Sequence, residues 1–245
     1  MLMRILATGL VAGVLAGGVV AGLQYVTTTP LILKAETYEK AEAAPPAADA
    51  GAAATAAHSH DAGTPAHSHG EGEEWAPEDG LPRTAFTTLA TVGAGVGFAF
   101  MLLAVLLASG VTPTARTGLA WAAGAFVATG LAPALGLPPE LPGSAAAELV
   151  SRQIWWIGTV AATGLGLWLI ARTSGVLTIA LGVALIAAPH IIGAPHPHEY
   201  SSQVPAEIAG HFTASSLVVH AVLWVLVGSI AGFIWQRADS RAAAI

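Results

Sequence analysis

Six long apolar runs, separated by polar segments, dominate the hydropathy pattern of this chain. None of them contains Asp, Glu, Lys or Arg, and they cover residues 5–26, 86–108, 117–135, 153–171, 176–192 and 212–235. A helix of roughly 20 apolar residues crosses a hydrocarbon core of about 30 Å, where a backbone is stable when its hydrogen bonds are made internally. The pattern predicts an all-α fold, a polytopic transmembrane helical bundle with six spans, of which the fifth is the shortest.

The first run has two interpretations. Arg4, an apolar stretch and the small residues at 19–21 also describe a secretory signal peptide. The run is longer than a typical signal-peptide core, and Gly9, Gly13 and Gly17 stand four apart, a spacing typical of close helix contact. We therefore favour a retained first helix. Cleavage would leave five spans, and so would a re-entrant fifth segment.

The polar segments predict how the chain is divided. Residues 1–26 form the first transmembrane helix, 27–84 an extracytoplasmic His- and acid-rich loop, 85–236 a five-helix core and 237–245 a cytoplasmic tail. The middle of the long loop is rich in Ala, Pro and Gly without apolar periodicity, so we expect it to be largely disordered. Its beginning, 30–39, differs in composition and is expected to extend a helix beyond the membrane.

Charge is divided unevenly between the two sides that the runs define. The side opposite the amino terminus carries fourteen of the fifteen Asp and Glu residues and seven of the nine histidines. The amino-terminal side carries five basic residues in short segments: Arg4, Arg116, Arg172, Arg237 and Arg241. Because basic residues gather in cytoplasmic segments, we expect a cytoplasmic amino terminus and an acidic outer face.

Composition excludes several classes of protein. With 54% hydrophobic and 10% charged residues and a mean hydropathy of +0.67, the chain has too little charge to cover a soluble globule. It has no cysteine, which removes disulfides and thiolate metal sites. Neither an HExxH motif nor a P-loop occurs, so we expect no enzymatic activity and no bound organic cofactor. The net charge of −6 argues against nucleic acid as a partner.

The long loop contains one triplet twice, as His58-Ser-His60 and His67-Ser-His69, followed by several glutamates. Neutral imidazole suits Co²⁺, Ni²⁺, Cu²⁺ and Zn²⁺, and a flexible tract can wrap several of these side chains around one ion. A site of this kind follows the general affinity series and does not select one metal. The loop is interpreted as an antenna that concentrates ions, and the alternative is a solvated spacer that is rich in His.

A second group of candidate ligands lies at the outer ends of the last two runs. Pro189 cannot donate a backbone hydrogen bond, so it leaves a carbonyl one turn earlier without its helical partner, as is common in transport sites. Glu207 and His211 are four apart and share one face of a helix. The predicted metal ligands here are His190, His196, His198, Glu207 and His211.

His220 lies about eight residues into the last run, roughly 12 Å below its outer end. An ionisable group at that depth costs free energy unless it finds a partner or water, which favours a functional role as a metal ligand. The alternative is a neutral histidine bonded to a neighbouring carbonyl or to Ser216 one turn earlier. Both interpretations stand on the sequence alone.

Other patterns predict structure. Gly93 and Gly97, and likewise Gly228 and Gly232, repeat the spacing of helix contacts. Glu148 and Arg152 are also four apart, just before the fourth run, and are expected to pair at the outer rim.

Four segments together resemble the CbtA family, probable subunits of a bacterial cobalt transporter. They are Pro30-Leu-Ile-Leu-Lys-Ala-Glu-Thr-Tyr-Glu39, Leu137-Pro-Pro-Glu-Leu-Pro-Gly143, Ser151-Arg-Gln-Ile-Trp-Trp156 and Ala188-Pro-His-Ile-Ile-Gly-Ala-Pro195. The likeness covers nearly the whole chain. It implies cobalt uptake for cobalamin biosynthesis in a bacterial inner membrane, with a small single-span partner, CbtB, that carries its own histidine motif. Five spans are often quoted for the family, against the six predicted here.

The leading hypothesis is a membrane subunit for uptake of Co²⁺, with Ni²⁺ or Zn²⁺ as related cargo. Outer His and carboxylate groups would collect the ion, and the bundle would pass it inward along His220. Two other hypotheses remain open: an extracytoplasmic metal chaperone or sensor, and a scaffold whose partner forms the path. The expected partners are lipid and the single-span subunit, with a homo-oligomer also open.

Overall fold

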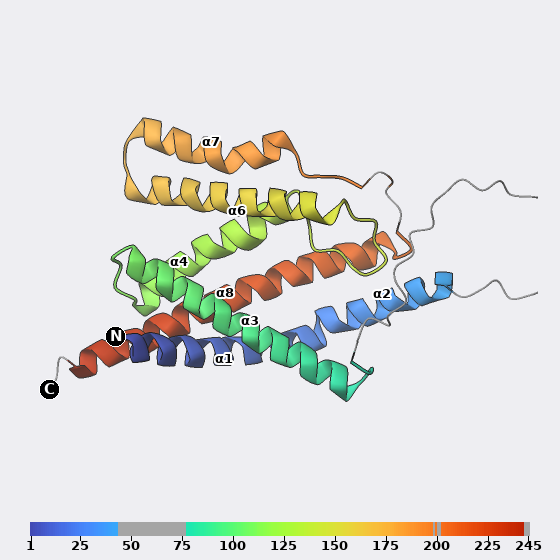
Figure 1. Cartoon of the computed structure of the whole chain (residues 1–245), viewed down its shortest axis with the longest axis horizontal. Helices are drawn as coiled ribbons and strands as arrows, with labels where there is room; N and C mark the ends of the chain where they lie inside the picture. Colours follow the sequence, from blue (N-terminus) through green and yellow to red (C-terminus); the bar gives the residue numbers. More distant parts are fainter. Residues whose placement is uncertain (44–76, 198, 200–201, 243–245) are drawn as a thin grey trace, which may run out of the picture.

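The computed structural model describes residues 1–43, 77–197, 199 and 202–242, and they form a helical bundle (Figure 1). Its helices are α1 (Leu2–Val26), α2 (Thr28–Ala43), α3 (Leu81–Ala108), α4 (Ala115–Phe126), η1 (Val127–Leu131), α5 (Ala132–Ala134), α6 (Leu149–Arg172), α7 (Val176–Ile192) and α8 (Ala206–Ala242). The short elements η1 and α5 continue α4 without a break. The middle of the predicted long loop, residues 44–76, lies outside the described residues.

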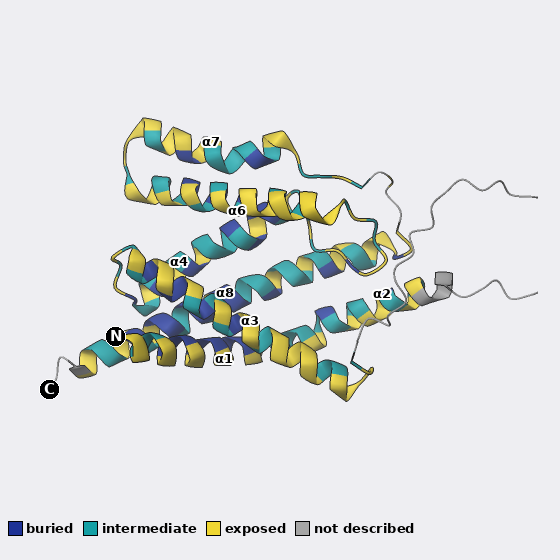
Figure 2. Ribbon diagram, in the orientation of Figure 1, coloured by how far each residue is buried: buried dark blue, intermediate teal, exposed yellow. Residues whose placement is uncertain are grey.

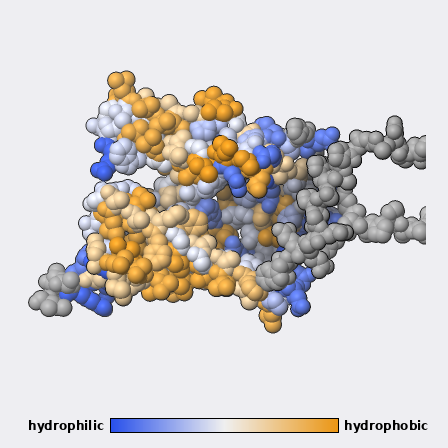
Figure 3. Space-filling model, in the orientation of Figure 1, coloured by the Kyte–Doolittle hydropathy of each residue, from blue (hydrophilic) through white to orange (hydrophobic). Residues whose placement is uncertain are grey.

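All six predicted apolar runs form helices. Five helices are long and apolar enough to cross a membrane, namely α1, α3, the continuous α4–η1–α5, α6 and α8. The sixth, α7, has 17 residues and falls below that length, so six spans are not confirmed, although a helical membrane bundle is. The six apolar helices run in alternating directions along the chain, with α7 antiparallel to both α6 and α8 (Figure 1), and hydrophobic residues cover much of the visible middle of the molecule (Figure 3).

This alternation gives the bundle two chemically different ends. The end where α1 begins is called the basic end here, and it carries Arg4, Arg116, Arg172 and Arg237. The end where α1 finishes is called the acidic end, and it carries Glu36, Asp79, Glu140, Glu148 and Glu207.

Glycines allow α1 to approach α3 closely. A Cβ atom added to Gly13 would lie 2.3 Å from the Cα of Val96, and one added to Gly17 would lie 2.6 Å from the Cα of Val92. Contact at this range brings two backbones into van der Waals contact, which drives helix association when apolar burial gives no advantage over lipid. The predicted contact stripe on the first helix is therefore confirmed. Figure 2 shows the buried side of α1 facing the other helices.

Glycines also bring two further pairs of helices into close backbone contact. The α4–α8 pair closes where a Cβ on Gly228 would lie 2.5 Å from the carbonyl oxygen of Gly118, which confirms the predicted role of Gly228 and its neighbour Gly232. The α6–α7 hairpin closes at Gly166 and Gly182.

The prediction for Gly93 and Gly97 is wrong. A Cβ on either residue would meet nothing within 4 Å, because Gly95, on the opposite side of α3, makes the contact with α1.

At the basic end, Arg4 joins the first helix to the last. Its guanidinium pairs with Asp239, donates to the backbone carbonyl of Trp235, and lies 4.0 Å from the centre of the Trp235 ring. These contacts and the glycine stripe build α1 into the bundle.

At the acidic end, the predicted helix over 30–39 is confirmed as part of α2. Its Ala35 packs with Leu141, Val204 and Phe212 in a small apolar cluster separate from the main core. Arg83 at the start of α3 pairs with Glu36, so α2 is also tied to α3.

The beginning of α6 corrects one prediction. Arg152 does not pair with Glu148 but with Glu140, at 3.1 Å. Glu148 instead caps α6: its carboxylate accepts the backbone N–H groups of Val150 and Ser151 at 2.9 and 2.7 Å, and the Ser151 hydroxyl at 2.7 Å. The unpaired N–H groups of a first helical turn compete successfully for a carboxylate placed immediately before them.

Gly13→Ala is expected to destabilise the protein by about 1–3 kcal/mol, because the added methyl group meets backbone atoms of α3 that cannot turn away. Gly18→Ala is the matched control, since a Cβ there would meet nothing within 4 Å. Thermal unfolding of the two purified variants in detergent measures the difference. Equal melting temperatures would contradict the close α1–α3 contact.

Glu148→Ala is expected to lower the melting temperature more at neutral pH than in acid. Bonds from the Ser151 hydroxyl and from the backbone N–H groups of Ser151 and Val150 lower the pKa of Glu148. The stabilisation is therefore complete above the ordinary glutamate pKa of about 4.3 and is lost as the pH falls through the lowered value. The exposed Glu207, in the first turn of α8, provides the comparison through Glu207→Ala. A Glu148→Ala effect that is the same from pH 7 to pH 3 would contradict the cap.

Candidate functional site

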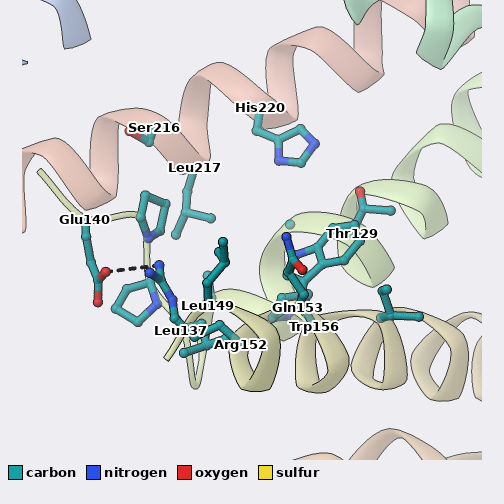
Figure 4. A pocket seen from close by; sticks show the side chains of 16 residues that line it. Thr129, Leu137, Glu140, Leu149, Arg152, Gln153, Trp156, Ser216, Leu217 and His220 are labelled. Atoms are coloured by element: carbon teal, nitrogen blue, oxygen red, sulfur yellow. Dashed lines mark hydrogen bonds and ion pairs between the residues drawn. The ribbon is translucent and has the colours of Figure 1, made fainter. Parts of the chain in front are cut away.

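A pocket of about 850 Å³ lies between the α4–η1–α5 helix, α6 and α8 (Figure 4). Its polar lining residues are Thr129, Glu140, Arg152, Gln153, Ser216 and His220. The rest of its wall is mainly apolar and includes Pro133, Leu137, Pro138, Leu149, Trp156, Ile157 and Leu217. A mostly apolar concavity with a few convergent polar groups is the usual form of a binding site.

The connection between α5 and α6 forms the wall at the acidic end. It turns at Gly136, where a Cβ would lie 2.6 Å from the Trp155 ring on α6. The Thr213 hydroxyl on α8 donates to the carbonyl of Pro139 at 2.9 Å, and Arg152 on α6 holds Glu140. Hydrogen bonds from two helices thus position this loop over the pocket.

The wall opposite His220 is the short π-helical segment η1. In it the backbone N–H of Ala132 bonds to the carbonyl of Val127, five residues earlier. Pro133 follows and has no N–H to donate, so the ordinary helical hydrogen-bond pattern cannot continue through it. Single π-helical turns are frequent at functional sites.

Gly130 of η1 leaves space for the His220 ring. A Cβ at Gly130 would lie 2.8 Å from the Nδ1 atom of His220 and 3.1 Å from the Phe126 ring. The imidazole can therefore occupy this position because residue 130 has no side chain. The edge of the ring that carries Nδ1 faces the glycine in the pocket wall.

His220 lies fourteen residues after the start of α8, roughly 21 Å along the helix axis. Its ring is surrounded by aromatic rings at centroid distances of 6.0 Å for Phe98, 5.8 Å for Phe126 and 6.4 Å for Trp224. The indole N–H of Trp224 donates to the Nε2 atom of His220 at 3.0 Å. This bond was not among the partners that the sequence suggested for the histidine.

The polar lining places charge at one end of the pocket. The Arg152–Glu140 pair belongs to the acidic end, while His220 projects from the middle of α8 toward η1 (Figure 4). Because the two charges of the pair compensate each other, the pocket has no net charge at this rim. The arrangement connects the acidic end of the bundle with an imidazole deep among the helices.

The other predicted metal ligands lie apart from this pocket or outside the described residues. His58, His60, His67, His69 and His198 belong to the second group. His190, in the last turn of α7, packs edge-on against the Trp155 ring at 5.9 Å, and its Nε2 atom is buried without a hydrogen-bond partner.

Three predicted ligands lie at the surface of the acidic end. Glu207 and His211 are exposed on the first two turns of α8, one turn apart as predicted, and His196 is exposed in the connection after α7. Within 1–43, 77–197, 199 and 202–242, no three His, Asp or Glu residues come close enough together to hold a metal ion.

Several residues of the pocket were not predicted. Thr129 and Gly130 become notable through the π-helix, for which Pro133 inside an apolar run was a visible signal. Trp224 follows His220 by four residues, a spacing that places the two side chains on one helix face. Gln153 reaches the pocket through tertiary packing and has no comparable signal in the sequence.

Comparison with protein families identifies the chain. A family model described as "Probable cobalt transporter subunit (CbtA)" matches residues 2–236. Comparisons with curated proteins and with solved structures find no match. The match extends from α1 into α8 and includes every helix that lines the pocket. The chain is therefore a multi-pass membrane protein of the CbtA family, a family of probable cobalt transporter subunits.

Proposed function

We propose that this subunit admits Co²⁺ from the acidic end of the bundle into the pocket between η1, α6 and α8, and that His220 binds the ion there during uptake. The observation that carries the proposal is the pocket itself, which joins the acidic end to an imidazole in the middle of a membrane-spanning helix. An ionisable side chain at such a position has a free-energy cost that a function can explain. Imidazole is a suitable ligand for cobalt and its neighbouring divalent metals.

The charge distribution supports this direction of entrance. Carboxylates outnumber basic residues on the acidic side of the chain, and the histidine pairs His58–His60 and His67–His69 belong to that side of the sequence. A surface of this kind raises the local concentration of cations near the pocket. In our proposal these residues, with Glu207 and His211, collect ions without selecting among Co²⁺, Ni²⁺ and Zn²⁺.

The polar residues along the pocket support passage through it. Ser216 lies one helical turn before His220, and Gln153 approaches from α6. Hydroxyl and amide oxygens can accept hydrogen bonds from the water that surrounds a divalent ion. Such groups bind an ion weakly enough for it to leave again, which conduction requires.

Topology and partners complete the proposal. Short basic segments at one end support a cytoplasmic amino terminus in a bacterial inner membrane, with the acidic end outside. A transporter subunit acts with lipid and with other subunits, and we propose a small single-span CbtB-like protein as one of them. Exposed apolar residues along α1, α3, α6 and α7 offer surfaces to lipid or to such a helix.

His220→Gln is expected to reduce cobalt uptake by about tenfold or more, the scale on which residues that support a metal site act. Glutamine keeps an acceptor for the indole N–H of Trp224 and so preserves much of the packing. Uptake of radioactive Co²⁺ by cells that carry the variant and its partner subunit measures the effect, with protein levels checked in the membrane fraction. Uptake at the wild-type rate would remove His220 from the path.

Gly130→Ala is expected to impair uptake because its methyl group would lie 2.8 Å from the Nδ1 atom of His220, on the pocket side of the ring. Gly124→Ala on the same helix is the matched control, since a Cβ there would meet nothing within 4 Å. The same uptake assay, repeated with purified protein in liposomes, separates passage from capture at the surface. If both variants transport equally, the pocket is not the route.

A further inference from the structure

We propose that the indole N–H of Trp224 restrains His220, so that the imidazole binds a passing cation transiently and does not retain it. The proposal rests on the function proposed above and assigns a positioning role to two residues, Trp224 and Thr129. Three observations carry it: the bond between the indole and the imidazole, the second acceptor that Thr129 offers to the indole, and the position of the other ring nitrogen beside Gly130 in the pocket wall.

The first contact fixes which nitrogen of His220 bears the proton. An indole N–H can donate but cannot accept, so the Nε2 atom of His220, 3.0 Å away, must be the acceptor. In a neutral imidazole one nitrogen accepts and the other carries hydrogen. The Nδ1 atom therefore carries the proton of the neutral ring.

An ion in the pocket would meet the Nδ1 side of the His220 ring. Nδ1 is the nitrogen beside Gly130, where both residues line the pocket. An ion arriving there meets an N–H group and not a lone pair. Coordination at Nδ1 requires the other tautomer, in which the same proton resides on Nε2.

That tautomer conflicts with the indole. With hydrogen on Nε2, two N–H donors would point at each other across the 3.0 Å contact between His220 and Trp224. Trp224 is 3% exposed and packs against the Phe98 ring at 4.9 Å, so its ring cannot easily swing away. The cost of this conflict weakens inner-sphere binding of a cation at His220.

Thr129 offers the indole N–H a second acceptor and so reduces the cost of this conflict. Its hydroxyl oxygen lies 3.2 Å from the indole nitrogen and so shares the N–H with His220. The hydroxyl hydrogen donates to the carbonyl of Ala125 at 2.8 Å, which leaves the oxygen lone pairs free to accept. When a cation takes Nδ1, the proton that leaves Nδ1 passes to water and one taken up from water replaces it at Nε2, so the ring keeps one proton. The indole N–H, without moving, then keeps Thr129 as its acceptor.

Trp224→Phe and Thr129→Val are expected to change cation affinity in opposite directions. Phenylalanine keeps an aromatic ring beside Phe98 but has no N–H, so the affinity of the pocket for Co²⁺ should rise by about fivefold, the factor that corresponds to one net hydrogen bond. Valine removes the second acceptor and should lower the affinity by a similar factor, while Thr129→Ser should restore it. Uptake by Trp224→Phe should become slower as the ion is retained.

The affinity is measured by calorimetric titration of Co²⁺ into the full-length protein in detergent. The difference between each variant and the same variant carrying His220→Gln removes binding by the outer histidines. Two results support a restraint that acts through the indole: the gain of Trp224→Phe disappears with His220→Gln, and Thr129→Val has no effect in the Trp224→Phe background. A fall in affinity for Trp224→Phe would overturn the proposal.

If the Trp224→Phe variant does not fold, nuclear magnetic resonance of the wild-type protein tests the same proposal. In wild-type protein labelled with ¹⁵N-histidine and ¹⁵N-tryptophan, the His220 nitrogens should report hydrogen on Nδ1, and the Trp224 indole signal should shift on addition of diamagnetic Zn²⁺. The shift should be absent in His220→Gln. Hydrogen on Nε2 before metal is added would refute the restraint.

If His220→Gln alone leaves cobalt uptake unchanged, the proposed function fails. If only the Trp224 and Thr129 results fail, the function stands without the restraint.

Discussion

The close approach of glycine-containing helix surfaces determines how this bundle is assembled. Lipid solvates apolar side chains as well as a helix neighbour does, so the helices gain most where their backbones meet directly. Three pairs meet in this way: α1 with α3 at Gly13, α4 with α8 at Gly228, and α6 with α7 at Gly166. The α6–α7 hairpin touches the rest of the bundle mainly through η1 and α5. The pocket lies in that looser seam, so the strong contacts elsewhere define where a cavity is left.

The same seam brings together the irregular parts of the backbone. The π-helix η1, Pro133 and the loop that carries Glu140 all line the pocket, and irregular backbone within a membrane protein is stable where it lines a cavity or is covered by protein. Of the four segments that carry the family resemblance, two line the pocket, and all four lie toward the acidic end. Their residues build α2 at the acidic end, the pocket wall from Leu137 to Glu140, the pocket face of α6 and the end of α7 beside Trp155.

Much of the fold could be predicted from hydropathy, because the length of an apolar run directly reports the thickness that it must cross. Spacing alone could not decide which glycines make contacts: Gly93 and Gly97 have the required spacing, but Gly95 faces α1. Glu148 caps α6 and leaves Arg152 to pair with Glu140 for a local reason, since the start of a helix offers N–H groups that a carboxylate prefers. The depth of His220 was visible in the sequence, whereas its pocket was not, because the residues that form it come from three separate segments.

The position of His220 also divides the bundle by depth. On the acidic side of this residue lies the pocket, while on the basic side α8 continues through the buried Val227, Ala231 and Trp235 in the main core. Arg4 covers the Trp235 ring and pairs with Asp239, and Arg172 of α6 reaches the carbonyl of Ser109, which ties the hairpin to the α3–α4 connection at that end. Under the proposed function, an ion that reaches His220 from the acidic side must therefore separate core side chains before it leaves at the basic end. In the proposed function this route runs along α6, which lines the pocket and whose hairpin with α7 meets the other helices mainly through η1 and α5, so a displacement of the hairpin would widen the route without opening the three glycine contacts.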